Sequence, residues 1–82
     1  MRRKVTYLRT GGDTVLRSDT IIGIFDMDNT TTSKHTIGFL NQAERDGRVT
    51  NLAADIPASF VVTDEGVYFT QIAPRTLKGR FL

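Results

Sequence analysis

The sequence predicts a small α+β fold in which one main helix packs on a mostly antiparallel sheet. Two observations lead to this fold class. Short runs of β-branched and aromatic residues recur between turn-forming glycines and aspartates, as in hairpins, and one segment alone has the apolar spacing of a substantial helix. The predicted order is β-β-β-α-β-β-β followed by a short C-terminal helix. With 82 residues, the chain is expected to form a single domain, 1–82.

A first hairpin is expected near the N-terminus. Residues 5–8 and 14–17 have β-type composition and flank the turn signal Gly11-Gly12-Asp13. The third strand, Ile21 to Phe25, is a nearly continuous apolar run, which is typical of a central strand buried on both faces. Gly23 within this run indicates that another group approaches the backbone closely.

The main helix is expected over residues 34–46, where apolar residues recur at helical spacing and polar residues fill the other side. Thr32 or Ser33 is a suitable N-cap, because its hydroxyl oxygen can accept a hydrogen bond from the first turn. Gly47 supplies the left-handed residue that commonly ends a helix.

The second half of the chain reads as three strands and a short helix. A short strand is expected at Val49 to Asn51. The clearest hairpin joins Ser59 to Thr63 with Val67 to Ile72 around the turn Asp64-Glu65-Gly66. Pro74 ends the last strand, and the remaining residues suffice for one or two turns of helix.

The composition excludes several classes of protein. Cysteine is absent, so disulfides, thiolate zinc sites and cysteine nucleophiles are excluded. The apolar runs are far shorter than the roughly 20 residues of a membrane helix, and no apolar signal-peptide core follows the basic start. We therefore expect a soluble, cytoplasmic protein that does not bind membranes. A chain this short has a thin core, which favours self-association.

Charge is strongly segregated along the chain although the net charge is only +2. Residues 1–17 carry five bases against one acid, residues 75–82 carry three bases, and the residues between carry three bases against eight acids. Two basic ends favour a polyanion such as nucleic acid if the fold brings them together. The alternative is that charged termini only solubilise a small domain.

Catalytic motifs are weak. Residues 24–30 resemble the first motif of haloacid-dehalogenase-type phosphatases, in which Asp26 would be the nucleophile and Asp28 the acid/base. Those enzymes have a parallel sheet with helices on both faces, so a helix-capping loop is favoured in a chain with one substantial helix. His35 is the single histidine and lacks partners at metal-ligand spacing. We expect no enzyme activity, metal site, cofactor or small-molecule substrate.

Four stretches, taken in their order and spacing, carry a resemblance to a known family. They are the glycine-containing turn before Val15-Leu16-Arg17-Ser18, the strand Ile21-Ile22-Gly23-Ile24-Phe25-Asp26, the helix end Ala43-Glu44-Arg45-Asp46-Gly47, and the closing block from Phe60-Val61-Val62-Thr63 to Pro74-x-Thr76-Leu77. Over nearly its whole length the chain resembles the small bacterial extracellular-matrix regulators RemA and RemB. The strand at residues 21–26 is closer to RemB.

This resemblance implies a fold related to LytTR-type DNA-binding domains, a homo-oligomer that can close into a ring, and transcription regulation of biofilm-matrix genes through DNA. RemA-type members contact DNA with adjacent arginines in the loop before the last hairpin. The corresponding loop here, Asn51 to Ala58, contains no base. The bases left to contact DNA are Arg2, Arg3, Lys4, Arg9, Arg45, Arg48, Arg75, Lys78 and Arg80.

Self-association would strengthen a weak basic patch by multiplying it. The alternative is an oligomeric scaffold or protein-interaction module of the same family that has lost direct DNA binding. Candidates to cover the free face or edges of the sheet are Tyr7, Tyr68, Phe69 and Phe81. For Phe69, a place in the core of the single chain is favoured.

Overall fold

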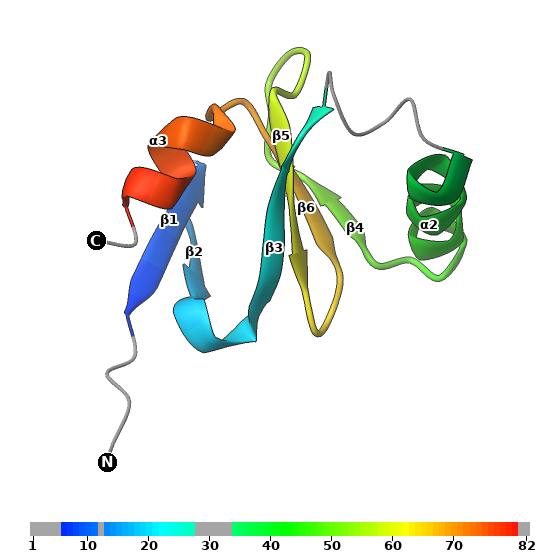
Figure 1. The fold of residues 1–82 in the computed structure, drawn as a ribbon, viewed down its shortest axis with the longest axis horizontal. Helices are drawn as coiled ribbons and strands as arrows, with labels where there is room; N and C mark the ends of the chain where they lie inside the picture. Colours follow the sequence, from blue (N-terminus) through cyan, green and yellow to red (C-terminus); the bar gives the residue numbers. More distant parts are fainter. Residues whose placement is uncertain (1–5, 12, 28–33, 81–82) are drawn as a thin grey trace.

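The structure is a computed structural model that describes residues 6–11, 13–27 and 34–80. In chain order the elements are β1 (Tyr7–Gly11), β2 (Thr14–Arg17), a 3-10 turn η1 (Ser18–Thr20), β3 (Ile21–Asp26), α2 (Lys34–Arg45), β4 (Val49–Asn51), β5 (Ser59–Thr63), β6 (Val67–Thr70) and α3 (Pro74–Gly79). Figure 1 shows their arrangement. The α+β class, the element order and the single main helix are confirmed. The predicted cap at Thr32 or Ser33 lies outside the described residues.

The strands form two sheets rather than the single sheet that the sequence predicts. β1 and β2 make a separate antiparallel pair, called here the β1–β2 ribbon. The larger sheet has the order β3-β5-β6-β4, in which β4 runs parallel to β6 and the other pairs are antiparallel. The ribbon stays separate because its buried Leu8 and Leu16 pack against Val61 of the larger sheet. It therefore covers a face of that sheet instead of extending an edge.

The molecule has three layers (Figure 1). The β1–β2 ribbon and α3 lie on one side of the larger sheet, and α2 lies on the other. The first core cluster joins Leu8, Leu16, Val61 and Leu77, and the second joins Ala43, Phe60 and Val67. Each buried large apolar side chain contributes about 1.5–3 kcal/mol to folding. The two clusters hold the outer layers to the sheet.

β3 is an edge strand, so the prediction of a central strand buried on both faces is wrong. An apolar run identifies a strand but does not reveal whether one or two neighbours pair with it. The pairing with β5 contains a bulge, since Ile21 lies opposite Thr63 whereas Gly23 lies opposite Val62. The close approach at Gly23 is confirmed, because a Cβ there would lie 2.7 Å from the ring of Phe25.

The turns follow local chemistry. Gly47 has φ +70 at the end of α2, as predicted. In the β5–β6 turn, the buried Thr63 hydroxyl accepts hydrogen bonds from the backbone N–H groups of Glu65 (3.2 Å) and Gly66 (3.0 Å). The same hydroxyl donates to the carbonyl of Gly66 at 3.0 Å. These bonds stabilise the turn between β5 and β6, which are the two inner strands of the larger sheet.

Candidate nucleic-acid interface

The fold brings the described parts of the two basic ends together. α3 packs beside β1 (Figure 1), with Leu77 of α3 and Leu8 of β1 buried in the same cluster. At the end of α3, the Arg80 guanidinium donates a hydrogen bond from Nη1 to the carbonyl oxygen of Arg9 at 2.8 Å. The charge pattern favours a polyanion only if the fold brings the two basic ends together. At β1 and α3, the described parts of those ends do lie together.

Four of the predicted bases gather there, and we call them the β1–α3 cluster: Arg9, Arg75, Lys78 and Arg80. All four are exposed. Arg75 and Lys78 are three residues apart on α3, which places them on a shared side of the helix, away from the buried Leu77. Long exposed basic side chains of this kind can reach successive phosphates without a cost of burial.

The outer face of the β1–β2 ribbon adds two residues that were not among the predicted DNA contacts. Alternation along the strands buries Leu8 and Leu16 and leaves Tyr7 and Arg17 exposed as a cross-strand pair. Tyr7 is 64% exposed and lies next to the β1–α3 cluster along β1. The signal that could have found these residues is the two-residue period of the ribbon, read together with its basic and aromatic composition.

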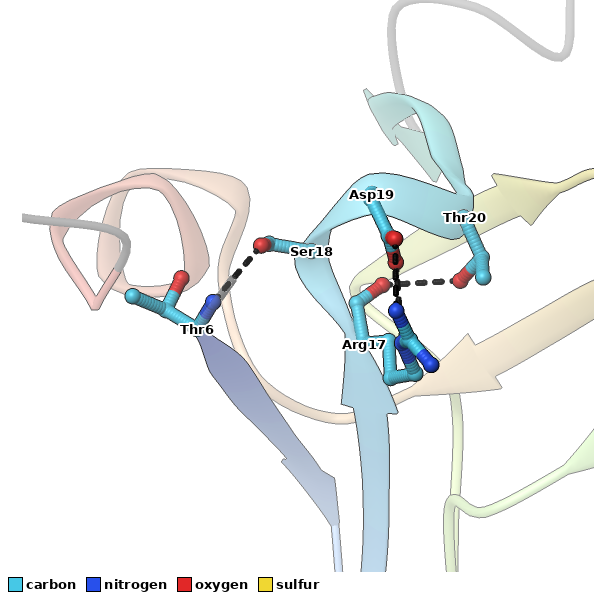
Figure 2. Close-up of polar contacts among 5 residues, drawn as sticks. All are labelled: Thr6, Arg17, Ser18, Asp19 and Thr20. Carbon is cyan, nitrogen blue, oxygen red and sulfur yellow. Dashed lines mark hydrogen bonds and ion pairs between the residues drawn. The ribbon is translucent and has the colours of Figure 1, made fainter. Parts of the chain in front are cut away.

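Arg17 is neutralised locally by Asp19. Its guanidinium donates two hydrogen bonds to the Asp19 carboxylate, from Nε to Oδ1 at 3.1 Å and from Nη2 to Oδ2 at 2.8 Å (Figure 2). Hydrogen bonding to the Asp19 carboxylate, followed by Coulomb attraction to it, raises the pKa of Arg17 above its ordinary value. Both side chains are exposed, so the pair shapes the surface more than it stabilises the fold.

Figure 2 also shows how this corner joins the ribbon to β3. The backbone N–H of Thr6 donates to Ser18 Oγ at 3.1 Å, and the N–H of Ser18 donates to the Thr6 carbonyl at 2.8 Å. The Thr20 hydroxyl donates to the Arg17 carbonyl at 2.7 Å. Serine, aspartate and threonine side chains compete readily for backbone groups, which is why the chain turns here. The corner fixes the direction in which the ribbon leaves the larger sheet.

The other predicted bases do not join the β1–α3 cluster. Arg45 ends α2 and Arg48 follows Gly47 just before β4, and α2 lies on the opposite side of the larger sheet. Residues 2–4, which carry the remaining predicted bases, lie outside the described residues. The sequence-predicted set is thus divided between two surfaces.

A second feature is an apolar groove on the α2 side of the larger sheet. It has a volume of about 270 Å³ and is lined by Ile22, Phe25, His35, Thr36, Phe39, Phe60 and Val62. Phe25 stacks on the buried Phe60 with ring centroids 5.2 Å apart. The exposed apolar side chains around this groove differ from those that the sequence analysis named. Tyr68 and Phe69 pack against the two clusters, and Phe81 lies outside the described residues.

The residues of the weak catalytic motifs are only partly described. Over residues 6–11, 13–27 and 34–80, no three His, Asp or Glu side chains form a group that could hold a metal ion. Asp26 ends β3, whereas Asp28 lies outside the described residues, and His35 is exposed beside the groove. Among the described helices, none combines the length and apolarity that crossing a membrane requires.

No protein-family model matches the sequence, and no curated protein matches it. The resemblance to RemA and RemB therefore stays a prediction.

Proposed function

We propose that this protein is a homo-oligomeric, DNA-associated transcription regulator of the RemA and RemB type, closer to RemB, which acts on extracellular-matrix genes in the bacterial cytoplasm. The observation that carries the proposal is the meeting of the described parts of the two basic chain ends, where Arg80 donates a hydrogen bond to the Arg9 carbonyl. The proposal includes a single domain related to LytTR-type DNA-binding domains. It includes no catalytic activity, cofactor or small-molecule substrate.

The β1–α3 cluster would bind the phosphate backbone. Each base that neutralises a phosphate releases a counterion, so affinity falls steeply as salt is raised. Phosphate contacts of this kind position a protein on DNA but carry little sequence information. Tyr7 and Arg17 on the outer face of the ribbon are the nearest groups that could approach base edges, because a two-stranded ribbon fits the major groove.

The second candidate is an oligomeric scaffold of the same family that works through another protein. It is favoured by the loop from Asn51 to Ala58, which carries Asp55 where RemA-type members carry arginines. It is also favoured by the apolar groove, since exposed apolar surface is typical of protein interfaces. Direct DNA binding distinguishes the two candidates.

The test compares two lysine reversals, Lys78→Glu in the β1–α3 cluster and Lys34→Glu at the start of α2. Both lysines are exposed and both variants change the charge by the same amount. Binding to a random fluorescent DNA duplex is followed by anisotropy at several salt concentrations, with the oligomeric mass determined on the same samples. We expect Lys78→Glu to weaken binding by about tenfold or more and to reduce the salt slope by about one, and Lys34→Glu to change little.

Two results would contradict the proposal. Absence of binding by the unaltered chain at low salt would leave the scaffold as the better candidate. Equal losses in the two variants would mean that binding responds to net charge and not to the β1–α3 cluster.

A further inference from the structure

In the part of the chain that the structure describes, the outer edge of β3 is open, because β5 pairs with one side of β3 and no strand pairs with the other. Proteins usually protect an open edge with prolines, lysines, β-bulges or a covering segment. The sequence of β3 is Ile-Ile-Gly-Ile-Phe-Asp, which contains neither proline nor lysine. Its bulge lies near its N-terminal end, between Ile21 and Gly23, so the regular segment that follows, Gly23 to Phe25, has the backbone and the composition to accept another strand.

The side chains beside the open edge are apolar and exposed. Ile22 is 71% exposed, Phe25 37% and Phe39 46%, and all three line the groove. The bulge in β3 places Ile22 and Phe25 on the same face, because one extra residue reverses the alternation between them. His35, Thr36 and Phe39 of α2 line the same groove, so this is the α2 face of the sheet, and α2 leaves Ile22 and Phe25 exposed.

We infer that this surface, formed by the open edge of β3 and the adjoining groove, is the interface with a second copy of the same chain. The two β3 strands would pair antiparallel about a two-fold axis near Gly23 and Ile24 and make a continuous eight-stranded sheet. This inference names the contact that the proposed homo-oligomer requires, but it does not depend on DNA binding.

The exposed area of the groove side chains suits a small, weak dimer interface. Ile22, Phe25 and Phe39 together expose roughly 300 Å² of side chain, from their exposed fractions and the ~150–250 Å² that a large side chain carries. Two copies would bury about twice that area, together with the paired strand edges and neighbouring parts of α2. Stable interfaces begin at roughly 1,200 Å² in total. The dimer should therefore depend on protein concentration.

Charge favours the antiparallel arrangement. Asp26 is the charged residue of β3 and lies at its C-terminal end. Parallel pairing in register would place the two Asp26 carboxylates side by side, which is unfavourable. Antiparallel pairing about Gly23 and Ile24 places them at opposite ends of the paired segment, each beside uncharged residues of the other copy. A second β3 strand is thus a complementary partner for the first.

The two-fold arrangement also determines the direction in which the outer layers of the two copies face. In a continuous sheet joined by antiparallel edge strands, the two-fold axis is perpendicular to the sheet, so equivalent faces lie on the same side. The two β1–β2 ribbons and both α3 helices would face one way, and the two α2 helices would face the other. Each groove would lie beside its symmetry mate.

The test uses a matched pair of isoleucine-to-lysine variants. Ile22→Lys places a charge at the open edge, and Ile56→Lys places the same charge in the loop between β4 and β5, where the isoleucine is 82% exposed. The oligomeric mass of each variant and of the unaltered chain is determined by analytical ultracentrifugation over a wide range of concentration. We expect Ile22→Lys to weaken self-association by at least about tenfold, because a lysine at the edge loses its hydration on pairing, and Ile56→Lys to match the unaltered chain. A monomeric unaltered chain, or equal masses for the two variants, would overturn the inference.

A second measurement keeps the inference testable if Ile22→Lys does not fold. Because the sequence contains no cysteine, Ile22→Cys and Ile56→Cys each carry one thiol. A flexible bismaleimide should link two copies of Ile22→Cys into a species of twice the chain mass and should leave Ile56→Cys unlinked. Equal crosslinking of both variants, or of neither, would contradict a β3 interface.

Discussion

Gly23 in β3 and Gly66 in the β5–β6 turn are each closely approached by another group, but those groups differ in how easily they can move. A Cβ on Gly23 would lie 2.7 Å from the ring of Phe25, which is the end of a side chain beside the open groove. A Cβ on Gly66 would collide with the backbone carbonyl of Arg48. That carbonyl accepts a hydrogen bond from the N–H of Val67 at 2.8 Å, so it is held by the pairing of the sheet.

This difference predicts the order of stability of two alanine variants. Gly66→Ala should lower the free energy of unfolding by about 1–3 kcal/mol, because the backbone of the β4–β6 junction must shift. Gly23→Ala should cost only about 0.5–1.5 kcal/mol, because Phe25 can rotate into the groove at the loss of its stacking on Phe60. Urea denaturation of both variants, followed by circular dichroism, measures the two costs. The reverse order would mean that the Phe25 ring is fixed more firmly than the β4–β6 junction.

At the scale of the element, α2 is held to the sheet by few contacts. Ala43 is its buried residue, Leu40 packs partly against the same cluster, and Ile37 and Phe39 remain substantially exposed. Gly38 lies in the middle of the helix, and a Cβ there would have no neighbour within 4 Å among the described residues. The helix therefore combines weak packing with a residue of low helix propensity.

We expect Gly38→Ala to raise the free energy of unfolding by about 0.5–1 kcal/mol, because alanine restricts the unfolded chain more than glycine does and meets no obstacle in the helix. Thermal unfolding and helical circular dichroism give the readout. Gly79→Ala is the control, since Gly79 is equally open but ends α3, where helices fray. A loss of stability in Gly38→Ala would show that another part of the molecule packs over this side of α2.

The elements set by local residues could be predicted from the sequence, and those set by distant pairing could not. The β5–β6 hairpin follows from its turn residues, and the end of α2 follows from Gly47. The edge position of β3 depends on which strand reaches its other side, which an apolar run does not specify. The separation of the ribbon likewise depends on Leu8 and Leu16 packing against a strand more than 40 residues away.

In the candidate site too, some features could be predicted from the sequence and others depend on how distant elements pack. The basic character of both chain ends is visible in the sequence, but their meeting depends on α3 docking beside β1 through Leu77. For the same reason Arg45 and Arg48 could not be separated from the β1–α3 cluster before the fold was known. The groove was missed because its exposed members, Ile22 and Phe25, belong to a run that reads as buried.

For the whole molecule, the β1–α3 cluster and the apolar groove lie on opposite sides of the larger sheet. The β1–α3 cluster lies with the ribbon, and the groove lies with α2. If the β3 edges pair as inferred, self-association through one side leaves the other side free for DNA and brings two basic surfaces to face one way. Two linked weak sites bind more tightly than either alone, since the second contact is made at a high effective concentration.

This arrangement predicts how the salt dependence of DNA binding changes when the dimer is broken. The slope of log affinity against log salt is about −0.9 for each phosphate neutralised, so a dimer that applies both basic surfaces to one duplex should have about twice the slope of a monomer. We expect Ile22→Lys to show about half the slope of Ile56→Lys and a lower affinity at every salt concentration. The two variants carry the same added charge, so net charge cannot produce the difference. If their masses differ but their slopes agree, only one basic surface of the dimer reaches the duplex, and the two ribbons do not face the same way.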